Sequence, residues 1–214
     1  MILGYRGNAA WRDMSEFVVH LTHREALAGI LSECFVRPSK KALGAFLSHT
    51  SPPSEQCSAC FSEIPLDFLD RIAERQGRWG VGLAKRTIVD AGGARVWYLD
   101  RESPVQQAKF QYVKSFWSTP NDCPEILKTL APFIDVVQED KPGQRPYQFD
   151  WEREWRVPGG LSFDPSSVRF LVVPEDAHVE TRSRFGDFND HYSEVPMLDV
   201  SWTDERFQSE ASRI

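Results

Sequence analysis

The sequence has no apolar run that approaches the 18 or more residues needed to cross a membrane. Its first residues also lack the basic-then-apolar pattern of a secretory signal. Positive charge is in deficit, because 31 Asp and Glu outnumber 25 Lys and Arg and give a net charge of −6. This balance argues against binding nucleic acid through overall charge, although it still allows a local basic groove. We therefore expect a cytoplasmic protein with no membrane segment.

Cysteine is scarce, and the chain carries only Cys34, Cys57, Cys60 and Cys123. Cys57 and Cys60 have the two-residue spacing of a zinc or redox pair. A zinc site needs a second pair at similar spacing, and a redox pair should open a helix, whereas an apolar strand-like run follows here. We expect free thiols and no metal, with zinc or redox use as the less favoured alternative.

A phosphate-binding glycine loop is also missing. The glycine-rich segment 77–84 has neither the Gly-x-Gly-x-x-Gly order nor a Gly-Lys-Ser/Thr ending. The segment instead predicts a strand in which Gly80 and Gly82 let another backbone or a ligand come close.

The remaining composition is that of an ordinary globular protein, with 41% hydrophobic and 26% charged residues. We predict an N-terminal extension over residues 1–16 and a single α+β domain over 17–214. Residues 36–56 and 138–148 read as loops, and residues 176–192 are polar without a clear pattern. Thr22 and Glu25 form a predicted capping box at the start of the first helix. The expected strands are 17–22, 60–64, 77–84, 95–99, 151–157, 168–173 and a weak one near 198–202; the expected helices are 23–31, 66–75, 85–90 and stretches within 104–135.

Acidic, basic and indole side chains alternate over residues 151–156, Trp-Glu-Arg-Glu-Trp-Arg. In a strand, this alternation places Glu152, Glu154 and Arg156 on one face, with the two acids about 7 Å apart. Two acids and a base on one face, bordered by indoles, predict a chemical centre. An edge strand whose charged face meets water explains the same pattern without any chemistry.

Three blocks of the chain, spread over residues 17–175, resemble known families in their order. Residues 19–31 resemble the opening strand and helix of ADP-ribosyltransferase-like proteins, including the DarT-type enzymes that modify DNA. The segments 60–65, 80–83 and 154–156 resemble AbiGi-type abortive-infection proteins of bacterial phage defence. The resemblance implies a split β-sheet domain with peripheral helices, an NAD cleft, and a reaction that displaces nicotinamide from NAD.

The resemblance also implies roles for individual residues. His20, with the neighbouring Thr22, matches the first-strand motif that holds the NAD ribose or phosphate, and Ser62 matches the hydroxyl of the middle strand. Glu154 matches the acid that orients the reactive ribose, and Glu152 stands where a substrate-directing residue is common. The chain departs from the arginine-modifying toxins, because its middle motif is Phe-Ser-Glu and not Ser-Thr-Ser.

Elementary chemistry supports such a centre independently. Breaking the bond between nicotinamide and ribose develops positive charge on the sugar, which a fixed carboxylate such as Glu154 stabilises. The diphosphate of NAD favours nearby Arg side chains, of which Arg24, Arg78 and Arg156 are candidates. An indole, Trp79 or Trp155, would cover the pyridinium ring.

We therefore expect an NAD-consuming enzyme that modifies nucleic acid or protein in phage defence. The alternative is a non-catalytic module of the same fold that binds a nucleotide, an antitoxin or a phage protein. His20 as a core histidine and Ser62 as a backbone partner are the structural interpretations of the same residues.

Overall fold

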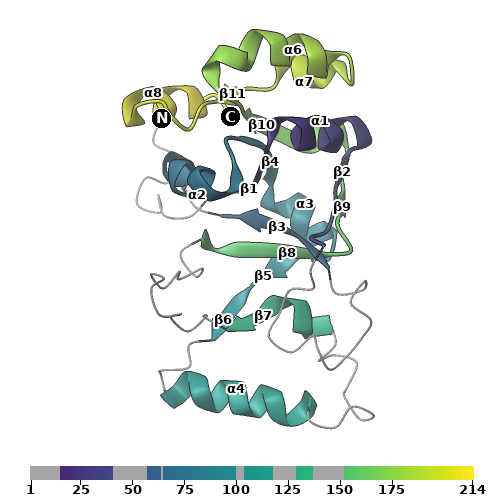
Figure 1. Cartoon of the computed structure of the whole chain (residues 1–214), viewed down its shortest axis with the longest axis vertical. Coiled ribbons are helices and arrows are strands. Elements are labelled where there is room, and N and C mark those ends of the chain that lie inside the picture. Colours follow the sequence, from purple (N-terminus) through teal and green to yellow (C-terminus); the bar gives the residue numbers. More distant parts are fainter. Residues whose placement is uncertain (1–14, 41–56, 64, 100–103, 118–128, 137–151) are drawn as a thin grey trace. The chain divides into compact units, whose positions relative to one another are not determined.

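The structure is a computed structural model that describes residues 15–40, 57–63, 65–99, 104–117, 129–136 and 152–214. Most of the expected N-terminal extension, most of the two long loops and Trp151 therefore lie outside the described residues. The chain divides into two compact units (Figure 1). The first contains Met1–Val36, Phe61–Ala91 and Leu161–Ile214, and the second contains Arg37–Cys60 and Gly92–Gly160.

The first unit is built on a sheet with the strand order β11-β10-β4-β1-β3. All neighbours are antiparallel except β10 and β11, which are parallel. The runs 17–22 and 168–172 are rich in β-branched and aromatic residues, which favour strands, and buried apolar side chains of the sheet make the core. The strands are β1 Phe17–Thr22, β3 Ser58–Ser62, β4 Trp79–Ala84, β10 Val168–Val172 and β11 Met197–Leu198, and a separate pair joins β2 Phe35–Val36 to β9 Leu161–Ser162.

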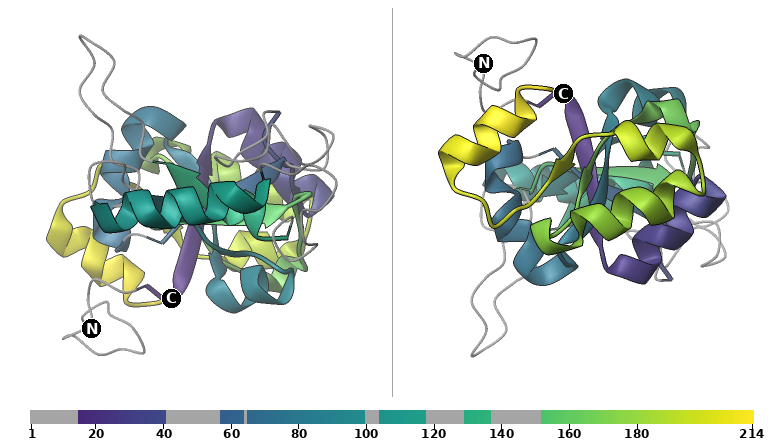
Figure 2. Two further views of the ribbon diagram at one scale, coloured as in Figure 1. Left: turned by 90° about the horizontal axis from the view of Figure 1, so that it is seen from below. Right: turned by 90° about the horizontal axis from the view of Figure 1, so that it is seen from above.

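Among the described residues, six α-helices belong to the same unit. Figure 2 shows α6 and α7 beside α1, and two ion pairs, Arg24–Glu180 and Arg184–Glu25, join α1 to α6. The helices are α1 Arg24–Glu33, α2 Leu69–Gln76, α3 Lys85–Asp90, α6 His178–Gly186, α7 Asp190–Glu194 and α8 Asp204–Ala211. None of the helices in the described ranges has the length and apolar character to pass through a lipid bilayer.

The glycines of β4 allow close approach, as the sequence predicts. A Cβ at Gly82 would lie 2.3 Å from the Phe170 ring, and one at Gly80 would lie 2.6 Å from the carbonyl oxygen of His20. Both contacting groups belong to neighbouring strands of the sheet, Phe170 to β10 and His20 to β1. The glycines therefore serve packing inside the first unit.

The second unit combines short strands with one long helix. Its strands follow the order β3-β8-β5, with residues 58–60 of β3 assigned to this unit, and β6 pairs with β7 in parallel. The register places Tyr98 opposite Asp135 and Ala94 opposite Arg156. The elements are β5 Ala94–Arg95, β6 Trp97–Leu99, α4 Pro104–Trp117, β7 Ile134–Val136 and β8 Glu154–Pro158.

The prediction of a mixed α+β protein is confirmed, since a mostly antiparallel sheet combines with several helices. Two local predictions are wrong. The predicted capping box of α1 is absent, because the residue at the helix N-cap is His23 and it makes no side-chain capping bond. Residues 176–192, read as polar without a clear pattern, contain α6 and the start of α7, and the segment after the predicted weak strand, for which no helix is predicted, forms α8.

Candidate functional site

The centre predicted at residues 151–156 is a cluster of charged side chains on β8. Glu154 and Arg156 share one face of the strand because they are two residues apart. Arg156 Nε donates to Glu154 Oε1 at 2.9 Å and Nη2 donates to Oε2 at 3.1 Å. The Arg156 side chain is 3% exposed and that of Glu154 is 13% exposed. The two groups therefore form a bidentate ion pair that is largely shielded from water.

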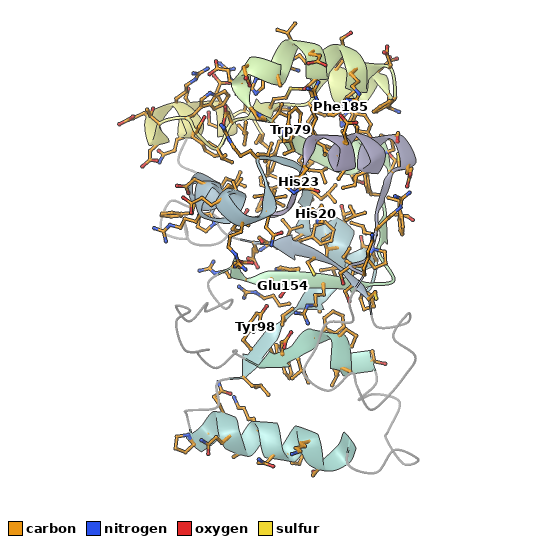
Figure 3. All side chains as sticks on the ribbon, viewed as in Figure 1. His20, His23, Trp79, Tyr98, Glu154 and Phe185 are labelled. Atoms are coloured by element: carbon orange, nitrogen blue, oxygen red, sulfur yellow. The ribbon has the colours of Figure 1, made fainter. Side chains whose placement is uncertain are left out.

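Three further groups from β6, β7 and the turn before β7 complete this cluster. The hydroxyl of Tyr98 donates to Glu154 Oε2, and Figure 3 labels both residues. Arg156 Nη2 also donates to Asp135 Oδ2 at 2.8 Å, and Nη1 donates to the carbonyl oxygen of Pro132 at 2.8 Å. The parallel register of β6 and β7 sets Tyr98 directly opposite Asp135, which explains why both reach the same pair.

The cluster changes the acidity of its members. Burial, reinforced by the Glu154 carboxylate, raises the pKa of the Cys60 thiol and of the Tyr98 hydroxyl well above their ordinary values. Burial disfavours the charge on Arg156, but the carboxylates of Glu154 and Asp135 outweigh it and raise its pKa. At neutral pH, Cys60 and Tyr98 are therefore neutral donors and Arg156 is a cation.

Glu152 departs from the predicted arrangement. The strand begins at Glu154, and Arg153 has a left-handed backbone with φ of 48°. A left-handed residue interrupts the alternation of a strand, so Glu152 is not the next member of the Glu154 face. Glu152 is instead 7% exposed and precedes the strand. The predicted face of two acids and a base is thus reduced to Glu154 and Arg156.

The predicted cofactor residues His20, Thr22 and Ser62 belong to the first unit. Val19 lies opposite Ser62 in the antiparallel pairing of β1 and β3, so His20 lies opposite Phe61 and their rings are 5.7 Å apart. Residues opposite one another share a face, and successive residues alternate. His20 and Thr22 therefore face one side of the sheet and Ser62 the other. The first unit does not bring the imidazole and the hydroxyl together.

Arg78 is engaged elsewhere in the first unit. Its Nη2 donates to Asp199 Oδ1 at 2.9 Å. The backbone N–H groups of Glu175 and Ser201 also donate to Asp199, at 2.7 and 2.8 Å. Burial acts against the charge of Asp199, but these donors prevail and lower its pKa. Arg78 thus helps to hold a buried structural aspartate.

The indoles proposed to cover the pyridinium ring belong to different units of the chain. Trp79 belongs to the first unit, where the guanidinium of Arg24 lies 5.5 Å from the ring centroid, and Trp155 belongs to the second unit. Arg24 itself pairs with Glu180. The arginine and the indole thus contact each other at the start of α1.

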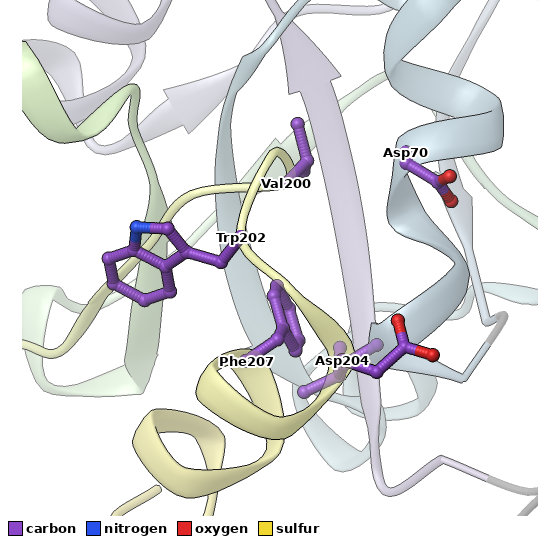
Figure 4. A pocket seen from close by; sticks show the side chains of 6 residues that line it. Asp70, Val200, Trp202, Asp204 and Phe207 are labelled. Carbon is purple, nitrogen blue, oxygen red and sulfur yellow. The ribbon is translucent and has the colours of Figure 1, made fainter.

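Metal binding finds no support in the described part of the chain, where no three His, Cys, Asp or Glu side chains gather in a way that could hold an ion. Cys57 and Cys60 form no disulfide bond. A small pocket in the first unit has an acidic side chain on each of two walls, Asp70 and Asp204 (Figure 4). Its volume of about 40 Å³ has room for only a few water molecules.

No motif or spacing along the chain indicates that Tyr98, Asp135 and Cys60 contact the pair of Glu154 and Arg156. Their separation from Glu154 along the chain hides the contact, and only the pairing of β6 with β7 and the order of β3 and β8 bring them together. The predicted strand at 95–99 was the signal that could have pointed to Tyr98.

No family model, curated protein or solved structure matches this chain.

Proposed function

We propose that the protein is an ADP-ribosyltransferase-like enzyme that uses NAD as substrate. In this reaction the bond between the anomeric carbon of the ribose and the nicotinamide nitrogen breaks. Nicotinamide leaves as a neutral molecule with the bonding electron pair. An oxygen or nitrogen of the acceptor then bonds to the anomeric carbon and releases its proton. Glu154 would stabilise the positive charge of the sugar between these two steps.

One observation carries the proposal: a single carboxylate is fixed in a sheltered position by charged and neutral donors. Glu154 is 13% exposed, and its two oxygens accept bonds from Arg156 and Tyr98. A carboxylate that cannot rotate does not have to reorganise when positive charge appears beside it, which is the basis of electrostatic preorganisation. Arg156 and Tyr98 are positioning residues in this scheme, because they act on the substrate through Glu154.

The resemblance, and not the geometry, supplies the biological setting. Under the proposal, the acceptor is a nucleic acid or a protein, and the role is in phage defence with an antitoxin or a phage protein as partner. His20, Thr22 and Ser62 are not required by the chemistry at Glu154. Arg78 is assigned to structure, because Asp199 holds it.

The test is release of nicotinamide from NAD by the full chain. Glu154→Gln keeps the size and one acceptor oxygen but removes the charge, so we expect release to fall by at least a hundredfold. Glu63→Gln is the matched control, since Glu63 is also a buried glutamate in an ion pair, with Lys85 Nζ at 2.7 Å, and lies in the first unit. Equal activity in Glu154→Gln and the wild type would remove Glu154 from the mechanism.

A second candidate is a non-catalytic module that binds a nucleotide or a protein partner. The hydrogen bonding of Glu154 favours this non-catalytic candidate, because both of its carboxylate oxygens already accept hydrogen bonds inside the cluster. In that case the ion pair only supports the fold. Binding of NAD without any release of nicotinamide, over a range of acceptors, would select this candidate.

A further inference from the structure

A pocket of about 290 Å³ opens on the second unit. It is lined by Arg95, Val96, Trp97, Tyr98 and Arg153. Two of these side chains are guanidiniums and two are aromatic, and none of the described residues lining the pocket is acidic. The volume is at the lower end of the range for small-molecule sites, which suits a single nucleotide better than a whole dinucleotide.

Backbone pairing fixes the two segments that form this pocket. Arg95 lies opposite Trp155 in the antiparallel pairing of β5 with β8, and the N–H of Val96 donates to the carbonyl oxygen of Glu154 at 2.9 Å. These contacts bring the chain around Val96 alongside Arg153, the residue before β8. Arginines from two distant parts of the sequence therefore line one opening on a defined scaffold.

The exposure of Trp97 is unusual for its size. Its side chain is among the large hydrophobic groups that meet solvent, with the residue 62% exposed. An exposed indole at the wall of a pocket offers a flat surface on which a base can stack, and stacking on aromatic side chains tolerates different bases. Trp97 therefore supplies the apolar half of a site whose other half is cationic.

The backbone at Arg153 supports this assignment. Its φ of 48° is left-handed, a conformation in which residues other than glycine are uncommon and which clusters at binding sites. Arg153 lines the pocket and lies immediately before the strand that carries Glu154.

We propose that this pocket binds a nucleoside phosphate, with its phosphate held by Arg95 and Arg153 and its base stacked on Trp97. A guanidinium binds phosphate oxygens through paired N–H donors, so two arginines at one opening suit a phosphate. Tyr98 lines the pocket and donates to Glu154, so the binding site adjoins the acid of the proposed function. The inference rests on that function only for the identity of the ligand, NAD, whose AMP half would occupy the pocket.

The experiment is titration calorimetry of the full chain with NAD, AMP, adenosine and a short single-stranded oligonucleotide. We expect AMP and NAD to bind and adenosine to bind at least tenfold more weakly. Arg95→Gln and Arg153→Gln should each weaken AMP binding about tenfold. Arg169→Gln is the matched control, because Arg169 is an exposed strand arginine in the first unit.

A pair of variants tests the stacking surface. Trp97→Leu should weaken AMP binding about tenfold, and Trp97→Phe should restore most of it because an aromatic face is retained. The exposure of Trp97 makes either substitution tolerable for folding, and circular dichroism verifies this. Loss of AMP binding in Trp97→Leu with recovery in Trp97→Phe would support the stacked base.

Several results would overturn the assignment: no AMP binding at millimolar concentration, arginine variants that bind AMP as the wild type does, or binding of the oligonucleotide alone.

The pocket proposal and the enzyme proposal fail separately. AMP binding that depends on Arg95 and Arg153, without nicotinamide release, leaves the pocket standing and removes the enzyme. Nicotinamide release that is unchanged in Arg95→Gln and Arg153→Gln leaves the enzyme and removes the pocket.

Discussion

Replacing Arg156 by Met tests how much the charged cluster of the second unit contributes to stability. Arg156 is 3% exposed and donates to Glu154, Asp135 and the Pro132 carbonyl. Methionine keeps much of the apolar stem but leaves the largely buried Glu154 carboxylate without its cation. Breaking a buried ion pair on one side costs about 3–5 kcal/mol. For a chain of this length, such a loss lowers the melting temperature by about 6–20 °C.

The assay is urea unfolding, with Arg86→Met as the exposed control. Arg86 is 81% exposed and pairs with Asp90 one helical turn away, so its loss should cost less than about 0.5 kcal/mol. The double variant Glu154→Gln/Arg156→Met removes both charges and keeps an acceptor for Tyr98. It should therefore be more stable than Arg156→Met alone by about 1 kcal/mol or more. If Arg156→Met costs no more than Arg86→Met, the buried pair does not stabilise the fold as described.

Three further predictions concern packing, pH and the assignment of Arg78. Gly82→Ala should lower the free energy of unfolding by about 1–3 kcal/mol, because the added methyl group meets the ring of Phe170. Gly29→Ala should raise it by up to about 1 kcal/mol, because the added methyl group has no atom within 4 Å; thermal melting of both variants measures the difference. Burial and a neighbouring carboxylate raise the pKa of Cys60 and Tyr98 above their ordinary values of 9.0 and 10.0, so the unfolded chain releases these protons first as pH rises. Stability should be full below about pH 9. It should fall by about 1.4 kcal/mol per pH unit above pH 9 through Cys60, and by the same further amount above pH 10 through Tyr98, so Cys60→Ala or Tyr98→Phe should flatten the slope. Arg78→Gln should reduce stability by about 1–3 kcal/mol in urea and leave nicotinamide release unchanged; a selective loss of release would return Arg78 to the site.

Local sequence patterns were sufficient to predict many of the strands and helices of the first unit. Strand β1 and helix α3 have the predicted bounds, since the first is a dense β-branched and aromatic run and the second follows a strand that ends at Ala84. Helix α8 escaped prediction because its buried residues are only Phe207 and Ala211, too few for a visible apolar stripe. Thr203, whose side chain caps that helix, was the signal that could have found it.

The candidate site was predictable only where it is local. Alternation along one strand predicts that Glu154 and Arg156 share a face, and on that face the two side chains form an ion pair. The same rule failed at Glu152. The left-handed backbone of Arg153 separates Glu152 from the strand, which begins only at Glu154. Tyr98 and Asp135 depend on the pairing of β6 with β7, which no spacing in the sequence encodes.

The position of β10 in the first unit affects how the chain emerges from the ribosome. Strand β4 is complete at Ala84, but its partner on one side is not finished until Val172. At about 5–20 residues per second, the edge of β4 stays uncovered for roughly 4–18 seconds of translation. An uncovered apolar edge recruits other strands. Nascent chains that stall before β10 should therefore aggregate or engage chaperones, while chains released after β11 should not.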